Sequence, residues 1–169
     1  EVGAQYGIQD ISNDFSVSNL INDERVVDQN TTNLFEYNKK VLGAYAAGAF
    51  EKDAWGVKLG FRLENTDLNT LLVNTSEENN LNYTNLFPTL HTSYKLTERL
   101  SFQAGYSRRI YRPRLWDLNP FFNIRNNFNI RLGNPELLPE FTDSYEVTGI
   151  YILEAISFNF GFYQRYTTD

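Results

Sequence analysis

The chain has 169 residues, of which 15 are Lys or Arg and 21 are Asp or Glu, so its formal net charge is −6. This charge argues against nucleic acid as the main partner, and the length leaves room for one domain. The sequence has no cysteine, no methionine and one histidine, which excludes disulfides, thiol nucleophiles and metal sites built on thiolates or on several histidines.

Alternation of apolar and polar residues predicts about seven β-strands. The clearest example is "AWGVKLGFRL" at 54–63, in which every second residue is apolar and most of the others are glycine, lysine or arginine. Each strand therefore has one apolar and one polar face. In chain order, strands are expected at 2–9, 35–50, 54–63, 85–96, 100–107, 143–153 and 158–163.

The connections between these strands are of two kinds. Three are short and polar, "EKDA" at 51–54, "LTER" at 96–99 and "LEA" at 153–155, and predict hairpins. The others, at 10–33, 65–83 and 112–140, are rich in Asn, Asp, Thr or Pro and are expected to be long loops. Short turns at one end and long loops at the other are typical of an outer-membrane β-barrel. A soluble antiparallel sandwich would alternate equally well and stays open on this pattern.

Aromatic residues near the expected strand ends fit the girdles of such a barrel. Trp55 and Phe50 lie beside one short turn, and Tyr106 and Tyr94 are placed toward the far ends. Bacterial single-chain barrels have even numbers of strands from eight upward. We therefore expect this chain to be a slice of a larger transmembrane barrel.

Two long stretches resemble the barrel of a known receptor family. They are "LFPTLHTSYKLTERLSFQAGYSRRIYRPRLWDLNPF" (86–121) and "GNPELLPEFTDSYEVTGIY" (133–151). Their succession of motifs is similar to that of TonB-dependent outer-membrane receptors of the Bacteroidetes type, the outer membrane protein β-barrel family. The upstream half, with "EVGAQYGIQDISNDFSV" and "FEYNKKVLGAYAAGAFEKDAWGVKLGFRLENTD", resembles earlier strands of the same barrels.

The resemblance implies a large barrel in the outer membrane of a Gram-negative cell, with a plug domain in its lumen. Such receptors import a scarce ligand, such as a siderophore, a glycan or a peptide, with energy supplied through TonB. We expect the plug and the remaining strands to lie outside residues 1–169. The implied partners are the TonB system, the plug, outer-membrane lipid and a surface lipoprotein. No cofactor is implied.

The stretch "GYSRRIYRPRLWDLNP" (105–120) marks the expected end of a membrane-spanning strand. Tyr106 and Ile110 end the apolar stripe, and Arg112 followed by Pro113 ends the ladder because proline has no N–H. The arginines at this level are expected to pair with headgroup phosphates or with loop carboxylates. The polar faces of the strands are expected to line the lumen with Lys58, Arg62, Glu64, His91, Arg109, Glu146 and Arg165.

The 112–140 loop carries the candidate ligand contacts. Aromatic and amide side chains on an external loop suit sugars or peptides, through stacking and hydrogen bonds. The alternative is a loop that packs over the barrel mouth. Gly133, before Asn134, suits a turn that requires positive φ. The candidate contacts are Arg112, Trp116, Asn119, Phe121, Phe122, Arg125 and Phe128.

No residue is predicted to be catalytic or to hold a metal. Two carboxylates that act together as acid and base must converge, but Glu64 and Glu146 lie on distant predicted strands. The competing hypothesis is a soluble β-sandwich that presents the 112–140 loop to a carbohydrate or a protein. A sandwich covers its apolar face within itself, whereas a slice of a barrel exposes that face and its edge strands. The isolated piece is therefore expected to self-associate.

Overall fold

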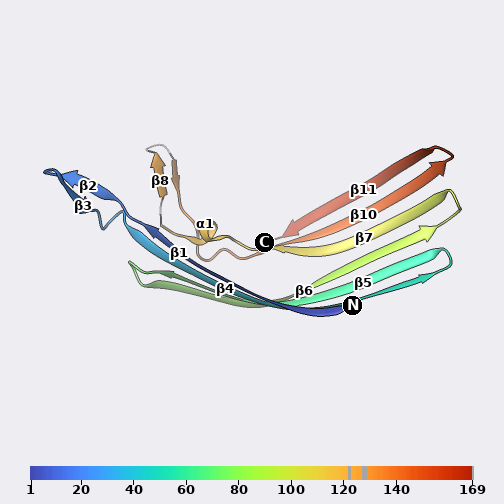
Figure 1. Ribbon diagram of the computed structural model, residues 1–169, viewed down its shortest axis with the longest axis horizontal. Helices are drawn as coiled ribbons and strands as arrows, with labels where there is room; N and C mark the ends of the chain where they lie inside the picture. The colour runs from blue at the N-terminus through green and yellow to red at the C-terminus, as the bar shows by residue number, and fades with distance from the viewer. Residues whose placement is uncertain (122, 127–128, 169) are drawn as a thin grey trace.

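Seven strands form one antiparallel sheet in a computed structural model of the chain (Figure 1). The structure describes residues 1–121, 123–126 and 129–168, with 123–126 and 129–131 described by their backbone alone. The strand order is β1-β4-β5-β6-β7-β10-β11, a meander, so the predicted all-β fold is confirmed. The bounds are β1 Val2–Phe15, β4 Asn33–Lys52, β5 Trp55–Leu72, β6 Glu77–Lys95, β7 Leu100–Tyr111, β10 Glu140–Leu153 and β11 Ile156–Thr168.

Short elements occupy two of the connections. Between β1 and β4 lies a small hairpin, β2 (Ser18–Ile21) and β3 (Glu24–Val27). Its two turn residues, Asn22 and Asp23, have φ of 51° and 66°, the left-handed conformation that two-residue hairpin turns require. Between β7 and β10 lie α1 (Leu115–Leu118), β8 (Asn123–Asn126) and β9 (Asn129–Arg131).

Among the described residues, no helix has the length and apolar character needed to cross a membrane.

The three predicted hairpin turns are confirmed, and they lie together at one end of the sheet (Figure 1). Asp53 and Glu154 adopt positive φ in two of them, at 52° and 48°. In the third, the Thr97 hydroxyl accepts hydrogen bonds from the backbone N–H groups of Arg99 and Leu100, at 3.2 and 3.0 Å. These local bonds fix the register of the long strands that follow.

The predicted loops at 65–83 and 10–33 are wrong over much of their length. β5 continues to Leu72 and β6 starts at Glu77, so 65–83 is mostly a hairpin with a tight turn at 73–76. β1 likewise continues to Phe15. These strand ends are rich in Asn, Asp and Thr, so their composition resembles that of a loop although they pair with their neighbours.

One face of the sheet, the outer face, carries a continuous apolar band at the end where the short turns lie. On β5 the band runs from Trp55 to Leu63, and the ladders place Leu63 beside Ala44 and Leu86. Trp55 packs on Tyr94 with ring centroids 4.4 Å apart, so Tyr94 lies beside a short turn and not at the far end as predicted. On β10 and β11 the band continues with Val147, Phe158, Phe160 and Phe162, all exposed.

Candidate functional site: the inner wall and the segment docked on it

The face opposite the apolar band, the inner face, carries the polar residues that the sequence predicted to line a lumen. The ladders pair Lys58 with His91, and pair Glu146 with both Gly105 and Tyr163. Alternation then places all seven predicted residues on this one face. They are Lys58, Arg62, Glu64, His91, Arg109, Glu146 and Arg165.

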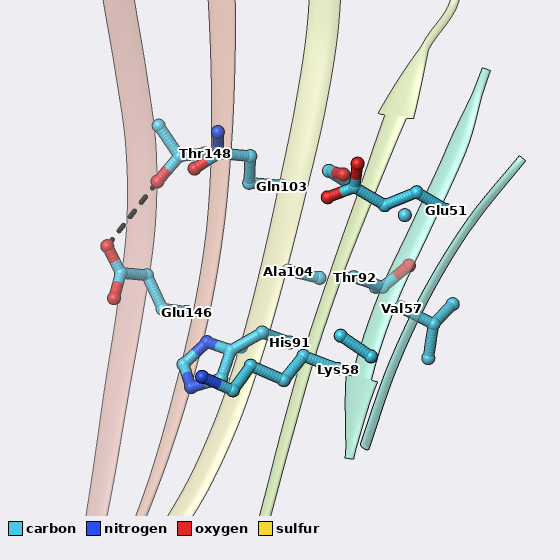
Figure 2. Close-up of a pocket in the computed structure, with 13 residues that line it drawn as sticks. Glu51, Val57, Lys58, His91, Thr92, Gln103, Ala104, Glu146 and Thr148 are labelled. Atoms are coloured by element: carbon cyan, nitrogen blue, oxygen red, sulfur yellow. Dashed lines mark hydrogen bonds between the residues drawn. The ribbon is translucent and has the colours of Figure 1, made fainter. Parts of the chain in front are cut away.

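A hollow of about 270 Å³ lies on the inner face near the short turns, from β4 across to β10. Figure 2 shows Glu146 and Thr148 on one side of it, Glu51 on the other, and His91 beside Lys58. The Thr148 hydroxyl donates to a carboxylate oxygen of Glu146 at 3.4 Å. Within the described residues, neither Lys58 nor Glu146 forms a salt bridge. This part of the wall therefore presents unpaired charges of both signs.

A second hollow, of about 400 Å³, lies further from the short turns between β6, β7, β10 and β11. Its polar groups form a short chain, in which Arg165 Nε donates to the Tyr163 hydroxyl at 3.0 Å and that hydroxyl donates to Ser144 Oγ at 3.5 Å. Arg109 also lines it. Tyr163 and Ser144 were not selected from the sequence, because their neighbours become known only from the register across β7, β10 and β11.

Beyond Leu63 the residues of β5 still alternate between the two faces of the sheet. The buried apolar side chains, however, now lie on the inner face and not on the outer face. From Glu64 to Leu72 every second residue is buried, and these residues lie on the inner face. We call this region, with the parts of β1, β4 and β6 that pair with it, the external part of the sheet. The buried core of the described residues lies on it: Phe35, Tyr37, Leu68, Leu72, Leu115 and Leu118.

Residues 112–121, the docked segment, cover this core. Leu115 and Leu118 of α1 contribute two of its buried side chains, and the segment therefore folds inward over the sheet. Its single helical turn is closed by the Asp117 carboxylate, which accepts a hydrogen bond from the backbone N–H of Arg114 at 3.1 Å. The exit from the loop is tied to the same turn, since Gly133 N–H donates to Asn119 O at 2.8 Å and Asn134 N–H donates to Asp117 O at 2.7 Å.

Gly133 is required by this close approach and not by its φ. No glycine in the described residues has positive φ, so the predicted positive-φ turn at Gly133 is wrong. A Cβ at this position would lie 2.5 Å from Asn119 O and 2.7 Å from Asp117 O. Such contacts are far inside normal van der Waals distance, and only glycine permits the two backbone segments to meet.

Glu64 joins the docked segment to the wall. Its two carboxylate oxygens accept from Arg62 Nε and from an Arg112 guanidinium nitrogen, each at 2.5 Å. The Arg112 guanidinium also donates to the Thr66 hydroxyl at 3.2 Å. The Glu64 side chain is only 8% exposed and that of Arg112 18% exposed. The ladder end at Tyr111 thus leads directly into a buried ion pair that spans from β7 to β5.

The pKa values of the external part reflect this burial. Burial alone would raise the pKa of Glu64, the first residue beyond the apolar band, but hydrogen bonds from Arg112 and Arg62 and their charges outweigh it and lower the pKa. Burial lowers the pKa of Lys39, and the Arg112 charge lowers it further. Burial also raises the pKa of Tyr37 to about 12. Glu64 is therefore held ionised beneath the docked segment.

The predicted loop contacts fall into three groups. Asn119 is buried and Arg112 is mostly buried in the docking of the segment, and the Phe121 ring is half-buried against the core, 6.4 Å from the Phe15 ring. Trp116 is 53% exposed and remains open to a ligand. Phe122 and Phe128 lie outside the described residues, as does the side chain of Arg125 in β8. Residues 112–121 of the predicted 112–140 binding loop thus largely pack on the sheet, and Trp116 remains a candidate ligand contact.

The whole chain, residues 1–169, matches the outer membrane protein beta-barrel family. The chain belongs to this family. The comparison with curated proteins returned no match. Membership places the protein in the outer membrane of a Gram-negative cell, so the apolar band of the outer face meets lipid and the inner face turns toward the interior of the barrel.

Family membership overturns the soluble β-sandwich. A sandwich needs a second sheet over the apolar face, whereas within the described residues that face is covered by no other layer and its large side chains are exposed. The described residues also contain no group of three or more His, Asp or Glu side chains able to hold a metal ion.

Proposed function

We propose that this outer membrane β-barrel chain is part of a TonB-dependent receptor that imports a scarce ligand, such as a siderophore, a glycan or a peptide. In this proposal the lumen is closed by a plug domain, import is energised by the TonB system, and a surface lipoprotein assists capture at the mouth. The chain performs no chemistry of its own and is not an enzyme.

The observation that carries the proposal is the external part of the sheet with its docked segment. The strands continue past the apolar band, and the segment folds inward over their inner face through a buried core and a buried ion pair. A passive pore needs an open mouth, whereas a receptor needs a fixed external surface that a ligand can recognise before it enters. The exposed Trp116 on this segment supplies an aromatic surface of the kind that stacks on sugars or peptides.

The inner face supports the same proposal. Its charged side chains at the level of the apolar band, such as Lys58 and Glu146, have no salt-bridge partner within the described residues. A plug that carries complementary charges would pair with the charges of both signs on this wall, whereas an apolar plug would bury them without partners. The motif order at 86–121 and 133–151, which resembles that of TonB-dependent receptors, adds to this support.

Gene disruption tests the proposal. Cells that lack the gene and cells that lack TonB are compared with the parent strain for growth on limiting iron, on single glycans and on peptides. The proposal predicts that both mutants lose growth on the same nutrient. Loss of growth in the gene mutant but not in the TonB mutant would indicate a passive barrel, and unchanged growth of the gene mutant on all three nutrient classes would contradict import.

A further inference from the structure

The second hollow of the inner face contains two arginines that form no salt bridge within the described residues. Arg165 uses one N–H, from Nε to the Tyr163 hydroxyl, and Arg109 has no hydrogen bond to a described residue. A guanidinium has five N–H donors. Most donors of this pair are therefore free, in a chain whose net charge of −6 makes a local positive cluster unusual.

The strand register places short side chains between Arg109 and Arg165. Arg109 lies opposite Thr142, and Arg165 lies opposite Ser144, which in turn lies opposite Ser107. Short side chains thus occupy the positions between the long ones, and a hollow of about 400 Å³ results. The short side chains are hydroxyls, so the floor of the hollow also offers hydrogen-bond donors.

We propose that this hollow binds the carboxylate group of a solute that passes through the barrel. The planar fork of arginine matches the two oxygens of a carboxylate, and such charge-assisted bonds are stronger than neutral ones. The floor hydroxyls of Ser107 and Ser144 complete the set of donors around the anion. A cleft walled by protein also focuses the field of Arg109 and Arg165 more than open solvent would.

Glu146 places a negative charge at one end of the hollow. It lines the same hollow and lies in register with Tyr163, two positions along β10 from Ser144. Its negative charge repels a second anionic group at that end and attracts a cationic one. The site therefore favours a solute with one carboxylate over a polyanion, and the affinity for a simple monocarboxylate is limited by the repulsion from Glu146.

Benzoate and its neutral analogue benzamide are suitable probes. The full receptor, purified in detergent, is titrated with each probe, and binding is measured by saturation-transfer NMR. We expect benzoate to bind and benzamide to bind at least tenfold more weakly. Arg109→Gln and Arg165→Gln should each weaken benzoate binding by fivefold or more, while Arg99→Gln, at the β6–β7 turn and outside the hollow, should leave it unchanged.

Glu146→Gln provides a readout that a folding defect cannot imitate, because it should tighten benzoate binding about three- to tenfold by removing the repulsion. Equal affinities for benzoate and benzamide in the wild type would overturn the assignment, as would unchanged benzoate binding in both arginine variants or weaker binding in Glu146→Gln. The titration involves no transport and no TonB, so its failure is distinguishable from failure of the import proposal.

Discussion

Replacing Glu64 with glutamine tests whether the ion pair with Arg112 holds the docked segment on the sheet. Glutamine keeps the shape of the side chain but removes its charge. Arg112 would then remain at the base of the segment without a counter-ion, and within the described part of the chain its Nε already lacks a hydrogen-bond partner. Arg62, which also pairs with Glu64, is a cation and cannot replace the lost negative charge beside Arg112.

The magnitude follows from the burial of the pair. Removing one partner of a fully buried ion pair costs about 3–5 kcal/mol. Because the Glu64 and Arg112 side chains are 8% and 18% exposed, we expect a somewhat smaller loss, about 2–3 kcal/mol in the free energy of docking. At about 1.4 kcal/mol per factor of ten, the undocked population should rise about 30- to 140-fold.

External trypsin on intact cells measures this population, because cleavage of a transiently open segment follows its equilibrium opening. The Arg114–Leu115 bond lies inside the docked segment, and the Arg112–Pro113 bond resists trypsin. Glu64→Gln should accelerate cleavage about 30- to 140-fold, whereas Glu77→Gln, exposed at the tip of the β5–β6 hairpin, should not. A wild-type cleavage rate for Glu64→Gln, or equal acceleration by the control, would refute the role of the ion pair.

Three further predictions concern the same surfaces. Gly133→Ala should weaken docking of the segment by about 1–3 kcal/mol and speed external proteolysis. Gly7→Ala, with open space at its Cβ, should behave as wild type. Equal proteolysis rates for the two variants would contradict the close approach at Gly133. The pKa of Glu64 is lowered in the folded protein, so the stabilisation of the docked segment by ionised Glu64 is present above the unfolded pKa of about 4.3 and is lost as pH falls through the folded value. Trp116 fluorescence, measured in a Trp55→Phe background, should therefore change only below about pH 5. The same change in a Glu64→Gln background would show that Glu64 is not the titrating group. Residues 1–169 alone, without detergent, should form oligomers by light scattering, and a monomer at high concentration would count against an uncovered apolar band.

The membrane-spanning part of the fold was predictable from the sequence because lipid and water impose a strict alternation. Trp55 to Leu63 reads apolar at every second position, and the predicted tight turns before β5, β7 and β11 fix which strands pair. The seven inner-face residues followed from the same alternation. Tyr94 was placed at the wrong end, although it lies two residues before the predicted 96–99 turn, which sets it beside Trp55.

The external part was not predictable from the same pattern because its buried apolar residues lie on the inner face, whereas those of the apolar band lie on the outer face. Beyond Leu63 the buried positions alternate with polar ones that face outward, so the composition resembles a loop. The sequence carried one signal that the strand continues, because Leu68 and Leu72 lie an even number of positions from Glu64 and so fall on the same face of a strand. Their cover, the docked segment, lies more than forty residues away in the sequence, so the pairing of Arg112 with Glu64 could not be predicted from the local pattern.

The central claim is that the sheet crosses the outer membrane with its apolar band toward lipid and its charged face toward the barrel interior. Residues 1–169 contain no cysteine, so single cysteines can be introduced within them and spin-labelled at Leu59 and Phe160 on the outer face and at Lys58 and Asn159 on the inner face. In membranes, labels at Leu59 and Phe160 should relax with oxygen and be protected from a water-soluble nickel chelate, and labels at Lys58 and Asn159 should show the reverse. Equal access of the chelate to all four positions would contradict the account.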